Sequence, residues 1–374
     1  MGKYDYTGKR VYMGIDVHKK TYVCVSVCGG SVVKKNAMPA EPSALISYIK
    51  NHFANATLET AYEAGFSGFH LHRELTDAGI KNSVVHPGSI EVASRDRVKT
   101  DRRDAHKIAT QLEAGRLRCI YVPSLAQECK RSVSRLRNNL VKFKHQTGNK
   151  IKSLLYTQGL IAGGDDTVIS KRWLTKKLAE VQELNYPAGY YYTLNRYAEL
   201  WLRFREDLKK IEEDLLAMQS DQEKVLLSIY KSAPGISDIT ALKLKDELGD
   251  MSQFSNERKL FSYLGLTPSE YSSGEHVQQG HISRQGRSVL RRILVEAAWT
   301  AIRKDLTLKE IYERIAKTRG GRKAIVGIAR RLAGRLRTCV QNGVFYEIKR
   351  LQEKEADVQH EVTRDPVQVF VGLS

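Results

Sequence analysis

The sequence predicts an α/β domain at the N-terminus, followed by a mainly helical remainder. In residues 10–35, apolar and polar side chains alternate with the period of a β-strand. Strand patterns then alternate with helical patterns as far as residue 123, an order typical of an α/β sheet. From Ser124 onward, the apolar residues recur almost only at helical spacing. A chain of 374 residues is long enough for two substantial cores, so we expect two globular parts and a connector.

The first domain, expected at residues 1–123, begins with a three-stranded meander and continues with helix–strand units. Paired turn residues, Lys19-Lys20 and Gly29-Gly30, separate the first three strands. The expected elements are strands Arg10–Val17, Tyr22–Val27 and Ser31–Val33, helix Pro42–Phe53, strand Thr57–Glu63, helix Ser67–Ala78, strand Asn82–His86 and a helix from Asp101 to about Arg116.

Residues 124–225 are expected to form a helical connector. They carry two apolar stripes with heptad spacing, of which the second, from Leu194 to Val225, is the more regular. Gly163-Gly164 and Pro187 interrupt the pattern, so we predict two long helices in a hairpin or coiled coil. An intramolecular hairpin and a dimerisation arm explain the stripes equally well.

A third domain is expected at residues 226–350, mainly α-helical, with a flexible or accessory tail at 351–374. Pro234-Gly235 between two helical patterns is typical of a helix-hairpin-helix, whose glycine turn presents backbone N–H groups to a phosphate. A polar loop is predicted from Gly265 to Gly274, before a basic helix. Serines in this loop are ordinary turn residues in most proteins, but Ser272 or Ser273 is also a candidate nucleophile.

The formal net charge of +19 implies a polyanionic partner, for which nucleic acid is the default. Six Lys or Arg residues lie between positions 95 and 107, and others follow Gly280. The residues that we expect to contact nucleic acid are Arg102, Arg103, Gly235, Arg284, Arg287, Arg291 and Arg292.

The sequence predicts a cytoplasmic protein with no membrane partner. No apolar stretch approaches the roughly 20 residues that span a bilayer, and the first ten residues are polar. The five cysteines are scattered and odd in number, which favours free thiols over a disulfide framework or a zinc site.

Four carboxylates are candidate metal ligands: Asp16, Glu63, Asp101 and Asp104. Asp16 interrupts an apolar run that is otherwise typical of a buried strand. Asp101 and Asp104 lie three residues apart on an expected helix, so both side chains leave the same face and can share one cation. An ordinary explanation competes, with Thr100 as N-cap and Asp101 as a favourable first-turn residue. Carboxylates among basic residues suit a polyanionic substrate that arrives with Mg²⁺.

Several motifs occur together and in order: Gly14-Ile15-Asp16-Val17-His18-Lys19, Glu63-Ala64-Gly65, Thr100-Asp101-Arg102-Arg103-Asp104-Ala105, Pro234-Gly235-Ile236, Ser273-Gly274 and Gly280-His281-Ile282-Ser283-Arg284-Gln285-Gly286 with Leu290-Arg291. This set resembles the DEDD transposases of bacterial insertion-sequence family 110, in its eleven-eleven branch. The resemblance covers about residues 10–160 and 226–340. Arg284 stands where the family more often has Lys, a change that keeps the charge.

The resemblance implies an RNase H-like (RuvC-like) first domain, a coiled-coil connector and a transposase domain with a catalytic serine. By position, Asp16, Glu63, Asp101 and Asp104 are then the tetrad that binds Mg²⁺, and Ser273 is the nucleophile that forms a phosphoserine with DNA. The implied partners are double-stranded donor and target DNA, a structured non-coding bridge RNA, and further copies of the chain in a dimer or tetramer, inside a bacterial cell.

Two other functions fit part of the sequence. In a RuvC-like junction resolvase or nuclease, the same tetrad activates water and Ser273 is a loop residue. In a non-catalytic nucleic-acid-binding protein, the fold and the positive charge remain but strand cleavage does not.

Overall fold

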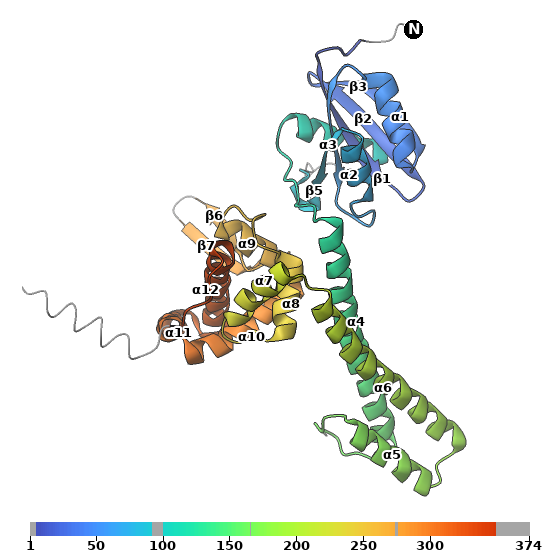
Figure 1. Cartoon of the computed structure of the whole chain (residues 1–374), viewed down its shortest axis with the longest axis vertical. Coiled ribbons are helices and arrows are strands. Elements are labelled where there is room, and N and C mark those ends of the chain that lie inside the picture. Colours follow the sequence, from blue (N-terminus) through green and yellow to red (C-terminus); the bar gives the residue numbers. More distant parts are fainter. Residues whose placement is uncertain (1–4, 92–99, 165, 274–275, 349–374) are drawn as a thin grey trace, which may run out of the picture. The chain divides into compact units, whose positions relative to one another are not determined.

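The computed structural model describes residues 5–91, 100–164, 166–273 and 276–348. Two compact units divide the chain, Met1–Pro123 and Ser124–Ser374. The first contains a mixed α/β sheet, and the second is mostly helical (Figure 1). This division of secondary structure confirms the α/β and mainly α parts of the predicted fold class. The tail predicted at 351–374 lies outside the described residues.

The first unit is built around a five-stranded sheet with the strand order β3-β2-β1-β4-β5. The meander of β1, β2 and β3 is antiparallel, while β4 and β5 run parallel to β1. The elements are β1 (Arg10–Val17), β2 (Thr21–Cys28), β3 (Ser31–Pro39), α1 (Pro42–Phe53), β4 (Thr57–Glu63), α2 (His70–Asp77), β5 (Lys81–Val85), the short 3₁₀ helix η1 (Pro87–Ser89) and α3 (Asp101–Glu113).

Helices cover both faces of this sheet. The larger core joins alternate residues of β1, such as Met13 and Ile15, to apolar side chains of α1 and α2. On the opposite face, Ala105 and Ile108 of α3 pack against β2, β4 and β5. Because strand side chains alternate between faces, the residues of β1 that flank Ile15 face α3.

The second unit contains α4 (Leu125–Thr157), α5 (Lys171–Glu183), α6 (Ala188–Ala217), α7 (Asp221–Ser232), α8 (Asp238–Leu248), α9 (Glu257–Leu264), β6 (Pro268–Ser273), β7 (His276–Ile282), α10 (Ser288–Lys304), α11 (Leu306–Arg319) and α12 (Gly321–Asn342). The predicted polar loop at 265–274 is wrong for its second half, because β6 pairs antiparallel with β7. The segment is rich in residues typical of turns, but its backbone forms the hydrogen bonds of a β-strand with β7. The expected start of the last domain at residue 226 falls within α7.

Helices α4 and α6 pack along one another in opposite directions. Arg137 donates a 2.8 Å hydrogen bond to Glu212, and further along the pair the rings of Phe143 and Phe204 have centroids 6.0 Å apart. The second apolar stripe, expected from Leu194 to Val225, is divided between two helices. Helix α6 ends at Ala217, and the side chains of Ser220 and Glu223 form a capping box that starts α7.

A group of buried or half-buried charges lies where α8 packs against α4 and α7, and we call it the α8 ion cluster. Arg131 donates to the backbone carbonyls of Asp246 and Glu247 at 2.9 and 2.7 Å, which satisfies carbonyls at the C-terminal end of α8. The cluster consists of Lys130, Arg131, Ser134, Arg135, Gln219, Glu223, Lys245, Asp246 and Glu247.

Candidate metal centre

Asp16 lies near the C-terminal end of β1, on the sheet face that α3 covers. Two residues earlier, Gly14 is in direct contact with that helix: a Cβ at this position would lie 2.0 Å from the Ala105 carbonyl oxygen and 2.5 Å from the Ala109 nitrogen. Only glycine allows so close an approach. Gly14 therefore sets the distance between β1 and α3, and with it the distance between Asp16 and the first turn of α3.

Asp101 and Asp104 both lie in the first turn of α3. Thr100 is the N-cap, and its hydroxyl accepts a 3.4 Å hydrogen bond from the Arg103 N–H. The ordinary explanation for this segment is thus correct as far as it goes, since the acidic residues also suit the positive end of the helix dipole. It does not explain why the Asp101 side chain reaches towards β1.

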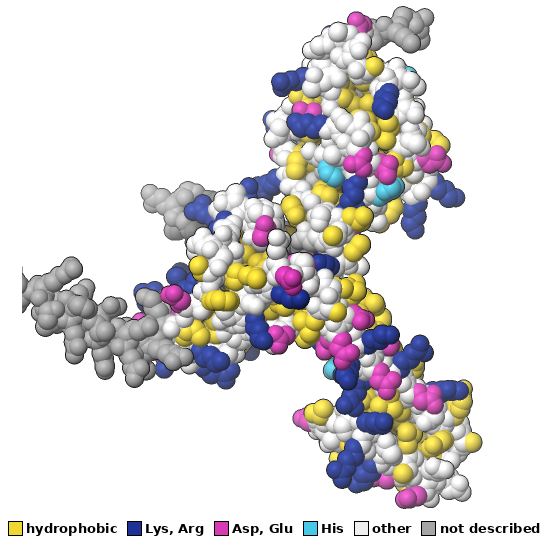
Figure 2. Space-filling model, viewed as in Figure 1, with side chains coloured by type: hydrophobic (Ala, Val, Ile, Leu, Met, Phe, Trp, Pro, Cys, Tyr) yellow, Lys and Arg dark blue, Asp and Glu magenta, His cyan; other side chains and the backbone are white. Residues whose placement is uncertain are grey.

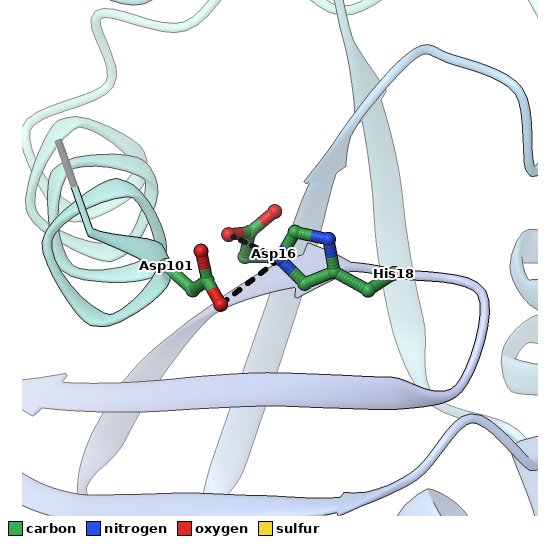
Figure 3. A group of neighbouring side chains, drawn as sticks. All are labelled: Asp16, His18 and Asp101. Atoms are coloured by element: carbon green, nitrogen blue, oxygen red, sulfur yellow. Dashed lines mark ion pairs between the residues drawn. The ribbon is translucent and has the colours of Figure 1, made fainter.

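His18 joins the two segments. Its Nε2 lies 3.2 Å from Asp16 Oδ2 and 3.3 Å from Asp101 Oδ2 (Figure 3). These three residues each offer one ligand atom within 4.8 Å of the others. The Nε2 atom is buried and makes no hydrogen bond of good geometry to any described residue. An acidic pair with one poorly satisfied nitrogen between its carboxylates fits a divalent cation, because two carboxylate oxygens and an imidazole form a common ligand set.

The electrostatics of Asp16 agree with this assignment. Burial raises the pKa of Asp16, and the carboxylates of Asp101 and Asp104 raise it further, against the lowering effect of His18. A carboxyl group in such surroundings is costly to ionise without a cation. Bound metal would remove that cost.

The structure brings together only part of the predicted tetrad. Glu63 ends β4, and because Ile15 pairs with Tyr62, Glu63 and Asp16 occupy the next positions of neighbouring strands. The Glu63 side chain is nevertheless exposed and lies outside the group of close ligand atoms. Asp104 is within 3.4 Å of Lys107 Nζ and is also not among them.

His18 is the residue that sequence reasoning missed as a site residue. It follows Asp16 by two positions and comes directly after the end of β1, so a position close to Asp16 could be expected. That signal was available. Sequence spacing did not predict that Asp101 lies close to His18, because this proximity depends on the contact between Gly14 and α3.

Ser272 and Ser273 lie at the end of β6, where they pair with Val277 and His276 of β7. Their side chains fall outside the described residues, as do residues 274–275.

The predicted nucleic-acid contacts have different surroundings. Arg102 is exposed on α3, as is Arg103. Arg284 is exposed and has a φ of 56°, and Arg292 lies 3.8 Å from Glu296. Arg291 is half-buried and donates a 3.2 Å hydrogen bond to the Leu264 carbonyl, so it also holds the end of α9.

Gly235 has a packing role that the sequence did not predict. Its φ is +81°, and a Cβ there would lie 2.8 Å from Ala297 Cα and 2.8 Å from Thr300 Cβ of α10. Glycine is required at this turn both for its conformation and for contact with α10.

Comparison with known proteins agrees with the fold and the metal centre. Residues 13–158 match the DEDD transposase family model, and residues 227–313 match the model for the IS116/IS110/IS902 transposase family. The chain is 28% identical over 276 residues to the transposase for insertion sequence element IS1111A of Coxiella burnetii, which covers 71% of this chain and 72% of the relative. It is 25% identical over 307 residues to the transposase for element IS1533 of Leptospira borgpetersenii, covering 78% and 85%.

An acidic centre on an α/β sheet, in a chain whose two matched segments are both transposase segments, defines a DNA recombination enzyme. The chain belongs to the IS110 family of insertion-sequence transposases. Membership implies a DNA substrate and the use of a divalent metal. No helix in the described part of the chain has the length and apolar character needed to cross a membrane.

Proposed function

We propose that this transposase cleaves and rejoins DNA strands with Mg²⁺, through a phosphoserine intermediate, under the guidance of a structured bridge RNA. One observation carries the metal part of the proposal: the carboxylates of Asp16 and Asp101, from segments far apart in sequence, meet at His18 Nε2. Glu63 and Asp104 complete the ligand set, since Glu63 lies on the neighbouring strand and Asp104 lies in the same first turn of α3 as Asp101. The RNase H-like assignment is supported by the strand order β3-β2-β1-β4-β5.

Asp16, Glu63, Asp101 and Asp104 would hold the metal. The metal would neutralise charge at the scissile phosphate and lower the pKa of the attacking hydroxyl. Ser273 then attacks phosphorus: its Oγ–P bond forms as the P–O bond of the DNA strand breaks, and the hydroxyl proton leaves while the departing oxygen gains one. Attack by a DNA hydroxyl on the phosphoserine reverses these changes and releases the serine. The bond energy is retained, so rejoining needs no ATP.

The partners follow from charge and from the family. A net charge of +19 and the Lys and Arg side chains visible on the helical unit (Figure 2) support extended contact with nucleic-acid backbone. We propose donor DNA, target DNA and bridge RNA as partners. We also propose a dimer or tetramer in which the metal centre of one subunit works with the serine of another.

The proposal is tested by trapping the covalent intermediate. Labelled duplex DNA that carries an end of the element is incubated with the full chain and Mg²⁺, and the mixture is then denatured. We expect a protein–DNA adduct with the wild type and with the matched control Ser272→Ala, but none with Ser273→Ala. Removal of one hydroxyl oxygen leaves the metal ligands in place, so nucleic-acid binding by Ser273→Ala should persist.

Other outcomes identify the alternatives. An adduct that persists in Ser273→Ala and disappears in Ser272→Ala moves the nucleophile by one residue. Nicked DNA without any adduct supports a nuclease that activates water. Binding without Mg²⁺-dependent cleavage in any form of the protein supports a non-catalytic role.

A further inference from the structure

A small basic cavity lies in the second unit, where the N-terminus of α10 meets α4 and α8. Its volume is about 130 Å³, which is ample for several waters or one phosphate group, since a single water needs about 10–15 Å³. We call it the α10 pocket. Its lining includes Arg135, Lys243, Glu247, Arg287 and Ser288.

Lys243 is the feature that needs an explanation. It is only 9% exposed and, among the described residues, has no hydrogen bond and no ion pair. Lys245, in the same helix, is 3% exposed but pairs with Glu223 and Asp246, each at 3.1 Å. A lysine with so little exposed surface and no ion-pair partner is costly, and native proteins rarely retain one without use.

The remaining charges of the pocket do not neutralise Lys243. Glu247 is the pocket's carboxylate, and Arg135 holds both of its oxygens at 2.8 and 3.0 Å. Arg287 lies 3.9 Å from the same carboxylate with half of its side chain exposed. Burial lowers the pKa of Lys243 to about 8, and Arg137 and Arg292 lower it further, against the raising effect of Glu212 and Glu296. Among the residues that line the pocket, cations therefore outnumber carboxylates around Lys243.

The first turn of α10 adds backbone donors. Ser288, Val289 and Leu290 all line the pocket, and the N-cap residue Arg287 makes no side-chain capping bond. The first N–H groups of a helix have no partner within the helix, and the helix dipole favours an anion at this end. An uncapped helix N-terminus and an unpaired buried lysine thus lie on one cavity.

We propose that the α10 pocket binds one phosphodiester group of a nucleic-acid backbone, with Lys243, Arg287 and the first amides of α10 as its ligands. The identity of the anion rests on the proposed function, because a transposase meets phosphodiesters as substrate and as guide. DNA and RNA offer the same chemistry here, so the experiment separates them. The site makes a positional contact: it fixes one phosphate and carries no base specificity.

The test compares Lys243→Met with wild type in the full chain. Binding is measured by fluorescence anisotropy over a series of salt concentrations, with a duplex DNA and a hairpin RNA of equal phosphate number. We expect Lys243→Met to lower affinity about tenfold at low salt and to reduce the log–log salt slope by about one unit. Lys224→Met is the matched control, because it removes the same charge from an exposed position that pairs with Asp221 at 2.8 Å.

The thermal stability of the Lys243→Met variant is a second measurement, and it should not fall together with the affinity. Methionine replaces an unpaired buried charge with an apolar chain of similar length, so the midpoint of thermal unfolding should stay or rise while affinity falls. Ser288→Glu is the second variant: an acidic residue at the first position of α10 favours the helix but places a negative charge in the pocket. It should likewise bind nucleic acid more weakly without loss of stability.

Each outcome decides the proposal. Loss of affinity for DNA alone, RNA alone or both supports the pocket and names its occupant. If both pocket variants bind both probes as the wild type does, or no more weakly than Lys224→Met, the pocket is not a phosphate site. A wild-type protein that binds neither probe overturns the proposed function itself, and the pocket with it.

Discussion

The carboxylates of the metal centre and those of the α8 ion cluster have opposite surroundings. In the cluster, Glu223 lies 3.1 Å from Lys245 and also accepts from Lys130, so that despite burial its pKa is lowered to about 2. At the metal centre, burial raises the pKa of Asp16, and the carboxylates of Asp101 and Asp104 raise it further, against the lowering effect of His18. A carboxylate held by two lysines stabilises the fold, whereas Asp16, whose pKa is raised, costs stability when it is ionised, until a cation binds.

The same reasoning applies to cations. Lys245 is buried and forms ion pairs with Glu223 and Asp246, so it stabilises the packing of α8 in the second unit. Lys243, two residues earlier, is buried and unpaired. In each unit, a charge that the surrounding side chains do not neutralise indicates where an outside ion of opposite sign is expected to bind.

The largest expected effect comes from Asp16→Asn. Strand cleavage should fall about a thousandfold or more, because bound metal supplies several kcal/mol of charge stabilisation. In the absence of metal, the free energy of unfolding should stay or rise, since a carboxyl with a raised pKa is costly when ionised. Cleavage rates and metal-free urea denaturation, measured on the same preparations, check both parts.

Glu59→Gln is the matched control for Asp16→Asn in the same unit, because Glu59 is a paired carboxylate 2.8 Å from Lys81 Nζ. It should cleave DNA normally and lose a little stability. Near wild-type cleavage by Asp16→Asn would remove Asp16 from the metal centre.

Arg131→Met should produce the largest loss of stability in the α8 ion cluster. It removes two hydrogen bonds to the carbonyls of Asp246 and Glu247 and a buried cation 3.9 Å from the Glu247 carboxylate. We expect about 3 kcal/mol less unfolding free energy, measured by urea denaturation of the second transition if the units unfold separately. Lys209→Met, an exposed residue 3.8 Å from Glu213, is the control and should change stability by less than about 0.5 kcal/mol.

Gly14→Ala should lose about 1–3 kcal/mol of unfolding free energy, because its Cβ would overlap the α3 backbone. Metal affinity, followed by calorimetry with Mn²⁺, should fall as well, since α3 must move away from Asp16. Gly189→Ala has open space around its Cβ in α6 and should be neutral or slightly stabilising. Unchanged metal affinity in Gly14→Ala would show that the β1–α3 distance does not control the site.

The sequence predicted the sheet elements because their apolar residues alternate, and the main helices because theirs recur at helical spacing. It predicted Asp16 and Asp101 as ligands from residue type and position, and the structure brings these two together. The helix expected at Ser67 begins only at His70, since Gly68 has a φ of +61° and cannot belong to the helix. Such end effects depend on one backbone conformation, which composition does not specify.

What the sequence could not predict depends on contacts between distant segments. No pattern around Lys243 and Lys245 distinguishes them, because the two differ only in which residues of α4, α7 and α10 lie opposite. Likewise Gly235 was interpreted through its backbone N–H groups, while the contact with α10 that requires a glycine lies more than sixty positions away in the chain. The spacing of residues in the sequence predicts which side chains share a face of a helix or strand, but the segment that packs against that face is set by the tertiary structure.

The smallest expected effect is a pH dependence of opposite sign in the two regions, observed with Glu223→Gln. Burial would raise the pKa of Glu223, but hydrogen bonds from Lys130, the Ser220 N–H and Lys245 lower it from 4.5 to about 2. A group with a lowered pKa contributes stability above its unfolded value, and this stability is lost as the pH falls towards the folded value. The wild type should therefore exceed Glu223→Gln by about 1–2 kcal/mol near neutral pH, a modest figure because about a quarter of the side chain is exposed. Denaturation at a series of pH values should show this difference shrinking between pH 4.5 and 2.

For Asp16→Asn in metal-free buffer the sign reverses. Because the pKa of Asp16 is raised, the stability of the wild type should increase relative to that of the variant as the pH falls. A difference that does not change with pH in either pair would contradict the contrast between Glu223, whose pKa is lowered, and Asp16, whose pKa is raised.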